Sequence, residues 1–520
     1  MKMTGRKFGY ALLLFVFVLG GCKKEQPTTS LPRSFPEAEG VSSQGIIDFL
    51  DAAAKSRHEF HSIMFLRHGK VIAEGWWNPY KPELKHTLYS TSKSFTATAV
   101  GFAVSEKRLS VNDKVISFFP DLLPDTLSPF LSNLKVKDLL SMSAGQDPDP
   151  TFTTVVKDSN WVKAFLAVPI VHEPGTKFLY NTLATYMLSA IVQKATGEKV
   201  IDFLKPRLFE PLAIEGMDWE VDPHGINCGG WGLRLKTEDM AKFGQLFLQK
   251  GKWNGKQVLP AAWVEEATTL KIYQAPDAPQ SKKDSSDWMQ GYCYQMWRCR
   301  HNCFRADGAY GQYIIVMPDQ DAVIAITCET PDMQDEINLV WEYLLPAIKT
   351  NKLDENTALA TNLKQKLSSL ALPFPVEGNN SVVASQISGK TFALEPNGKH
   401  LETMNFQFMD NMCKVSMLID STHYNFSLGS GKWISGETTL PGPDLLLLAK
   451  AHFVGLPAAK VAGSFGWKDE NTLELVLRYI ESPHTESINC KFDKNKVSVD
   501  FHYSDGLNNS QPELKGVIND

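Results

Sequence analysis

The spacing of apolar residues changes once along this 520-residue chain, and the change limits the folds open to it. Up to about residue 350, apolar residues recur mostly at helical intervals, interrupted by a few strand-like runs. Beyond about residue 385, short runs alternate apolar and polar residues and are separated by Asp, Asn, Gly and Ser. Helical spacing followed by strict alternation predicts two domains, a mixed one and an all-β one.

The first domain is predicted to contain one antiparallel sheet covered by helices. Apolar runs at 61–66 and 70–76, divided by the polar turn 67–69, indicate a β-hairpin. Three more strands are predicted at 292–297, 310–317 and 322–327, and helices at 46–54, 93–104, 136–142, 186–195, 240–248 and 336–348. This order indicates an α/β (α+β) fold, an antiparallel sheet flanked by helices with an inserted helical subdomain.

The second domain is predicted to be a small barrel or sandwich. Its strands are expected at 404–408, 412–419, 423–428, 472–480, 487–492 and 496–501. Residues 351–385 read as a polar helix and a Pro-rich linker, which divides the chain into domains at 41–350 and 386–520. Such a linker predicts that a fragment of residues 40–355 folds and keeps most of any activity that the first domain carries. The sequence also allows the opposite outcome, in which a loop of the second domain completes a functional site of the first.

The first 22 residues have the pattern of a lipoprotein signal. Lys2, Arg6 and Lys7 precede an apolar run at 8–19, too short to span a bilayer comfortably. Leu19-Gly20-Gly21-Cys22 resembles the lipobox of bacterial lipoproteins, in which Cys22 carries acyl chains; a plain signal peptide is the alternative. We expect a protein anchored by lipid to a bacterial membrane, facing the periplasm or the exterior, with residues 23–40 as a tether.

Charge and cysteine content argue against a nucleic-acid-binding protein, a fully disulfide-paired protein and a metalloprotein. The net charge is −5 and no basic stripe is present, so nucleic acid is not an expected partner. Seven cysteines remain after Cys22, an odd number that cannot pair completely within one chain. The sequence allows one disulfide among Cys293, Cys299 and Cys303 but does not decide whether it forms. No metal is expected, because no second pair of ligands stands near Cys299 and Cys303.

Ser90-Thr91-Ser92-Lys93 opens the predicted helix that follows. Residues three apart share a helix face, so Lys93 would lie beside the Ser90 hydroxyl. A hydroxyl needs a neighbouring base to become a good nucleophile, and a buried lysine can lose its charge and serve as that base. The motif alone is weak, since Ser90 could be only a helix cap.

Five segments in order resemble the serine β-lactamase and D-alanyl-D-alanine peptidase superfamily, in particular its class C-like branch, over residues 45–348. They are LYSTSKSFTATAVG around Ser90, LKVKDLLSMSAG at 134–145, EPGTKFLYNTLATYMLSAIVQKATG at 173–197, GGWGLRLKTEDMAKFGQLFLQKGKWNG at 229–255 and FRADGAYGQYIIVMPDQDAVIAIT at 304–327. An S-x-x-K nucleophile is among the catalytic motifs of this group.

The resemblance implies roles for residues outside the first motif. Tyr180 would help to move the serine proton. Asn181 stands one position before the usual asparagine of the Tyr-x-Asn motif, and Thr182 occupies that position. The segment Ala306-Asp307-Gly308 replaces the Lys-Thr-Gly or His-x-Gly motif, so its basic residue is missing.

The same segment is expected to complete an oxyanion site. The N–H group of Ala309 would be the second donor beside that of Ser90, and Gly308 would let the backbone approach the substrate. Asp307 either contacts substrate or caps a turn.

These features predict a serine hydrolase that cleaves an ester or amide of a small molecule or peptide through an acyl-enzyme on Ser90, without a cofactor. The resemblance places it nearer to esterases and 6-aminohexanoate-oligomer hydrolases than to true β-lactamases. A cell-wall D,D-peptidase or β-lactamase, and a non-catalytic binding protein on the same fold, are the alternatives.

Overall fold

A computed structural model describes Met1, Gly442 and residues 30–155, 158–375, 382–440, 457–506 and 512–519. The predicted signal segment and Cys22 lie outside the described residues. Among the helices of the described part, none is both long and apolar enough to cross a membrane.

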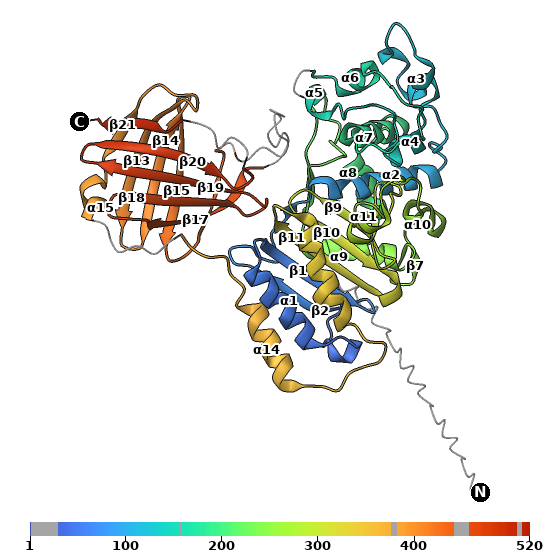
Figure 1. Ribbon diagram of the computed structural model, residues 1–520, viewed down its shortest axis with the longest axis horizontal. Helices are drawn as coiled ribbons and strands as arrows, with labels where there is room; N and C mark the ends of the chain where they lie inside the picture. Colours follow the sequence, from blue (N-terminus) through green and yellow to red (C-terminus); the bar gives the residue numbers. More distant parts are fainter. Residues whose placement is uncertain are drawn as a thin grey trace.

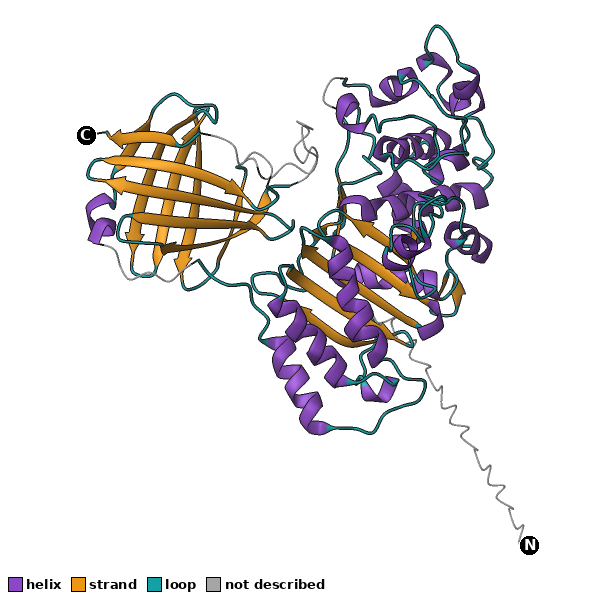
Figure 2. Cartoon of the chain, viewed as in Figure 1, coloured by secondary structure: helices purple, strands orange, loops and turns teal. Residues whose placement is uncertain are grey.

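A six-stranded antiparallel sheet forms the centre of the first domain (Figures 1 and 2). Its order is β2-β1-β11-β10-β9-β8. The strands are β1 (Glu59–Arg67), β2 (Lys70–Trp76), β8 (Trp297–Arg298), β9 (Phe304–Gly308), β10 (Gln312–Met317) and β11 (Ala322–Glu329). The predicted hairpin and mixed fold are confirmed. The strand expected at 292–297 is instead reduced to β8 and an isolated bridge at Tyr292, and β9 was not predicted.

Each face of the sheet carries its own hydrophobic core. Alternate strand residues such as Ile63 and Phe65 pack on one face, and Met64 and Leu66 on the other. The first face is covered by α1 (Ser43–Lys55), α12 (Met333–Leu339), the π-helical η7 (Val340–Leu344), α13 (Leu345–Ala347) and α14 (Thr357–Ser368). The second face is covered by α9 (Thr237–Leu248) and by α2 (Ser92–Ser105).

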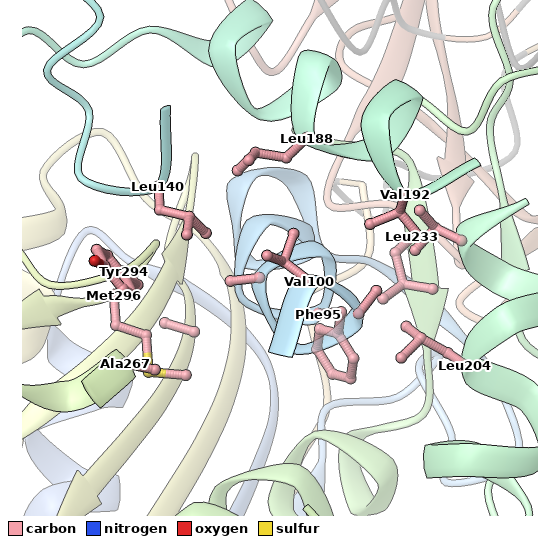
Figure 3. Packing of buried hydrophobic residues seen from close by; sticks show 14 of the residues in the cluster. Phe95, Val100, Leu140, Leu188, Val192, Leu204, Leu233, Ala267, Tyr294 and Met296 are labelled. Atoms are coloured by element: carbon pink, nitrogen blue, oxygen red, sulfur yellow. The ribbon is translucent and has the colours of Figure 1, made fainter. Parts of the chain in front are cut away.

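Helix α2 is buried almost all round, which positions the S-x-x-K motif inside the domain. Figure 3 shows Phe95 and Val100 of α2 surrounded by apolar side chains from several other elements. The helix also carries Lys, Ser and Thr residues, and most of these are buried as well, so it occupies a core position rather than a surface one. The start of α2 is therefore held on all sides by packing.

The helical subdomain lies between α2 and α9 in the sequence. Its helices are α3 (Pro129–Asn133), α4 (Val136–Leu140), α5 (Thr151–Val155), α6 (Trp161–Ala167), α7 (Thr182–Thr196) and α8 (Val200–Leu204), followed by the π-helical η5 (Lys205–Phe209). Helix α7 ends where Gly197 adopts a φ of 81° and caps the last turn, a conformation that glycine adopts readily. Two small sheets and two helices complete the domain. One sheet consists of β3 (His86–Thr87), β5 (Leu233–Leu235) and β4 (Asp218–Trp219), and the other of β6 (Lys252–Trp253) and β7 (Lys256–Gln257). The helices are α10 (Ala261–Thr268) and α11 (Gln280–Ser285).

Both segments that the sequence presents as linkers are partly built into the first domain. Helix α14 packs on α1 and β2 with Leu363 buried, and Leu372 donates a backbone hydrogen bond to Asn78. At the other end, Ser34 donates to Val71 of β2 and Leu31 is buried. Residues 31–34 and 357–372 therefore belong to the first domain.

The second domain is a closed β-barrel (Figure 1). Its strands are β12 (Thr391–Leu394), β13 (Leu401–Met409), β14 (Met412–Ile419), β15 (Thr422–Ser430), β16 (Ile434–Thr438), β17 (Ala459–Trp467), β18 (Thr472–Tyr479), β19 (Thr485–Asp493), β20 (Lys496–Tyr503) and β21 (Leu514–Ile518), with α15 (Val382–Ile387) packed on β13. All six predicted strands are present. The pairings β12–β21 and β15–β17 close the sheet around an interior filled by Phe, Leu and Val side chains.

Every cysteine of the described residues is a free, buried thiol. The disulfide that the sequence left open among Cys293, Cys299 and Cys303 is therefore not formed in this structure. Burial raises the pKa of the Cys293 thiol to about 12 and that of Cys299 to about 11, which keeps both protonated at neutral pH.

Candidate active site

Ser90 lies in a single 3₁₀ turn, η2 (Tyr89–Thr91), that leads directly into α2. Leu88, just before the turn, donates a backbone hydrogen bond to Leu233 of β5. Tyr89 adopts a φ of 47°, a left-handed conformation that is uncommon for a residue with a bulky side chain. The serine thus follows a strained residue, and backbone strain of this kind is often found at functional sites.

Lys93 lies directly beneath the serine. Its Nζ atom is 2.9 Å from Ser90 Oγ and 2.7 Å from the carbonyl oxygen of Gly230. The side chain is buried, and burial lowers the pKa of Lys93 to about 7, although the negative charges of Asp149 and Asp307 act in the opposite direction. An amine with this pKa is neutral in a large fraction of molecules at neutral pH and can accept the serine proton.

Gly230 is a residue of the site that the sequence did not reveal. A Cβ atom at this position would lie 2.7 Å from the carbonyl oxygen of Thr182, so a larger residue would push α7 away from the site. The Gly229-Gly230 pair in the segment that begins GGWG is the signal that could have identified it.

Tyr180 completes the group around the serine. Lys93 Nζ lies 4.9 Å from the centre of the tyrosine ring, and that ring stacks on Trp297 at 5.5 Å. Burial raises the pKa of Tyr180 well above its usual value, the charge of Asp307 adds to this, and a hydrogen bond with Ser90 opposes it. The hydroxyl is therefore protonated at neutral pH and able to pass a proton rather than hold a negative charge.

Asn181 has a structural position in this arrangement. Its side-chain oxygen caps α7 by accepting from the Ala184 N–H at 3.0 Å, and its amide donates to Gln146 at 2.8 Å. The side chain is buried, so these contacts support a capping role. They give no support to its predicted role in substrate binding, which stays a prediction.

Strand β9 brings the second predicted oxyanion donor toward the serine. The strand packs against η2, and a Cβ atom on Gly308 would lie 2.1 Å from the carbonyl oxygen of Leu88. Only glycine permits this approach. Ala309, the next residue, is exposed, whereas Ala306 is buried in the main core.

Comparison with known proteins shows the family to which the chain belongs. The family model described as Beta-lactamase matches residues 54–345, more than half of the chain. The chain belongs to the beta-lactamase family. Homologues in this family are serine hydrolases, which supports assigning the chain to the hydrolases of this superfamily.

Individual relatives cover different shares of their own length. The chain is 26% identical over 290 residues to a 6-aminohexanoate-dimer hydrolase of Paenarthrobacter ureafaciens. The match covers 52% of this chain and 73% of that protein. The chain is 25% identical over 167 residues to protein Flp of Staphylococcus aureus strain MW2, which covers 30% of this chain and only 33% of that protein. A Bacillus anthracis structure proposed to be a 6-aminohexanoate-dimer hydrolase has a TM-score of 0.51 and 21% identity, covers 62% of this chain and 89% of its own, and supports the fold.

Asp307 of this beta-lactamase-family protein pairs with a residue that the sequence did not single out. Its carboxylate accepts from Arg305 Nε at 2.9 Å, and both side chains are buried. The Arg305 guanidinium lies 4.3 Å from the Trp288 ring centre and 5.5 Å from that of Trp297. Asp307 is therefore an ion-pair partner next to Lys93 and Tyr180, and the described contacts show no turn-capping role.

The Lys93 pKa predicts how the reactivity of Ser90 depends on pH. The neutral amine is the form that can accept the serine proton, and it predominates above a pKa of about 7. We therefore expect labelling of Ser90 by a fluorophosphonate to be constant at higher pH and to fall about tenfold per pH unit below about pH 7. The measurement is the second-order labelling rate of the full chain between about pH 5 and pH 9. A rate that rises as pH falls would show that charged Lys93 is the active form.

Proposed function

We propose that the protein is a serine hydrolase that cleaves an ester or amide bond of a small molecule or peptide through an acyl-enzyme on Ser90. The observation that carries the proposal is the 2.9 Å contact between Ser90 Oγ and Lys93 Nζ, made by an amine whose burial lowers its pKa to about 7. Together they supply a nucleophile and a base matched to neutral pH.

In the proposed reaction Ser90 Oγ attacks the substrate carbonyl carbon while Lys93 takes the serine proton. The carbonyl oxygen becomes an oxyanion that the N–H groups of Ser90 and Ala309 stabilise. When the C–O or C–N bond breaks, the departing alcohol or amine receives a proton through Tyr180 and Lys93. Water then attacks the acyl carbon while the same groups take its proton, and they return that proton to Ser90 Oγ as the bond between Oγ and the acyl carbon breaks and the acid is released.

The charges near the serine favour neutral esters or amides over β-lactams. At position 306 an alanine, buried in the core, replaces the basic residue that would hold a substrate carboxylate. Arg305 cannot replace it, because its guanidinium is buried and paired with Asp307. Phe178, Tyr180 and Trp297 belong instead to an aromatic cluster beside Lys93, which suits an apolar acyl or leaving group.

Substitution of the two proton-transfer residues tests the mechanism. Lys93→Ala and Tyr180→Phe should each lower kcat on a short-chain ester by about 10²–10⁴, the usual scale for lost general-base help. Because the two residues act as one unit, the double variant should lose far less than the product of the single losses.

Mass spectrometry of the probe-treated protein supplies the control for this test. A fluorophosphonate adduct should form at Ser90 in the wild type and be absent in Ser90→Ala. The proposal is wrong if a folded, active wild type carries no adduct at Ser90, or if either single variant keeps near wild-type turnover.

Substrate preference forms a separate test. The missing cation at position 306 removes a charge-assisted hydrogen bond, which costs roughly 1.5–3 kcal/mol. We expect kcat/KM to be higher for short-chain esters than for cephalosporins, measured side by side in absorbance assays. Cephalosporin turnover at rates typical of resistance enzymes would contradict this and favour a β-lactamase.

We further propose that the protein works at the cell envelope, held by a lipid on Cys22. The support is the sequence alone, a basic start, an apolar run and Leu19-Gly20-Gly21-Cys22. In a bacterial host, wild-type protein should sediment with membranes, and Cys22→Ser should lose the acyl mass and the anchor. A wild-type protein that is released without an acyl group would indicate a plain signal peptide instead.

A further inference from the structure

One of the barrel segments that contact the catalytic domain is the turn at residues 480–484, between β18 and β19. Glu481 accepts a backbone hydrogen bond from Thr87 at 2.9 Å, and its carboxylate pairs with Arg234 at 3.1 Å. The Tyr80 hydroxyl donates to the carbonyl oxygen of Ser482 at 2.9 Å. Thr87 is three residues before Ser90, so the turn is seated beside the segment that carries the nucleophile.

His484 at the end of this turn links a carboxylate of the catalytic domain to the residue before the nucleophile. Its Nδ1 atom is 2.6 Å from Glu329 Oε1, and its Nε2 atom contacts the Tyr89 hydroxyl. Burial raises the pKa of Tyr89 well above its usual value, so its hydroxyl keeps its proton and donates to Nε2. This direction corresponds to the imidazole tautomer with its hydrogen on Nδ1, the atom that faces Glu329. Ser504 of the barrel also donates to Glu329, at 2.7 Å.

The same imidazole packs against both strained turns of the site. The rings of Tyr89 and Tyr310 meet it edge-on, with centres 5.8 Å and 4.7 Å away. These two residues have positive φ angles, 47° and 63°. Tyr89 immediately precedes Ser90, and Tyr310 immediately follows Ala309. Left-handed conformations of bulky residues persist only where their surroundings hold them, and His484 is common to both surroundings.

We propose that His484 is a positioning residue for the hydrolase reaction. Through Tyr89 and Tyr310 it fixes the two turns that present Ser90 Oγ and the Ala309 N–H, so the barrel domain is part of the catalytic unit. This inference rests on the proposed function of Ser90. It also reverses the expectation that residues 40–355 keep most of their turnover, because that fragment lacks His484.

Full-length variants test the inference. Tyr89→Phe and His484→Phe keep a ring but remove the hydrogen bond between the two residues. Each should lower kcat on a short-chain ester and the Ser90 labelling rate by about 10- to 100-fold, since small misplacements of reacting groups have effects of this size. KM should stay within about threefold, because neither side chain is expected to bind substrate. His484→Gln, whose amide oxygen can still accept from Tyr89, should recover part of the loss.

Tyr80→Phe is the matched control. It removes a buried tyrosine hydrogen bond to the same barrel turn, to Ser482, without touching residues 89–90 or 309–310. It should change the thermal midpoint about as much as Tyr89→Phe does but leave kcat within about twofold. The double variant Tyr89→Phe/His484→Phe should be no slower than the worse single variant, since both remove one interaction.

Hydrogen exchange gives a readout that does not depend on activity. In Tyr89→Phe and His484→Phe, peptides covering 86–92 and 306–312 should exchange faster than in the wild type and in Tyr80→Phe. Unchanged exchange together with kcat values equal to that of Tyr80→Phe would overturn the positioning role, as would losses that multiply in the double variant. If His484→Phe fails to fold, Tyr89→Phe decides the matter alone. A wild type without turnover or an adduct at Ser90 would instead contradict the proposed function, while the exchange data still test the coupling.

Discussion

The site depends on the burial of one amine. Lys93 Nζ lies between Ser90 Oγ and the Gly230 carbonyl oxygen, and donates hydrogen bonds to these two neutral groups. A charged ammonium group is costly in such surroundings, so the lysine responds by a lower pKa rather than by recruiting a counter-ion. The packing around α2 is what makes this possible, because a helix that lay at the surface would leave the amine in water and fully charged.

Close backbone approach is the second requirement, and glycine meets it in two places. Gly230 brings its carbonyl oxygen to Lys93 beside the start of α7, and Gly308 lets β9 approach the Leu88 carbonyl. Each contact joins segments more than 100 residues apart in the sequence. The nucleophile, the base and the expected oxyanion donor therefore meet only after the sheet, α2 and α7 have packed together.

Local sequence pattern predicts much of this fold, but not the elements whose burial depends on tertiary contacts. The hairpin of β1 and β2, the end of α7 at Gly197 and six barrel strands follow from periodicity and turn residues that act over a few positions. Strand β9 was not predicted, although its short sequence FRADG alternates apolar and polar residues. All five residues are buried, because the charged Arg305 and Asp307 pair with each other inside the protein, and local sequence does not reveal that pairing.

In the candidate site, too, some features follow from local sequence and others depend on residues far along the chain. The spacing of Ser90 and Lys93 is helical and readable from sequence, and the structure brings Tyr180 to them as the resemblance implied. The pairing of Arg305 with Asp307 and the capping position of Asn181 depend on neighbours far along the chain. Most of helix α14 is polar, so its sequence indicates a linker, whereas the burial of Leu363 against α1 and β2 attaches the helix to the first domain.

The domain boundary in the sequence and the functional boundary in the structure need not coincide. The barrel has its own core and its own closed sheet, as an independent domain would. Its contacts with the first domain are nevertheless partly charged and desolvated: Arg234 and Glu481 are both buried, and Arg478 pairs with Glu59 of β1. Buried ion pairs add little net stability, but they penalise any docking that separates them. An interface of this kind holds one relative placement of the two domains, which is what positioning a serine from the neighbouring domain requires.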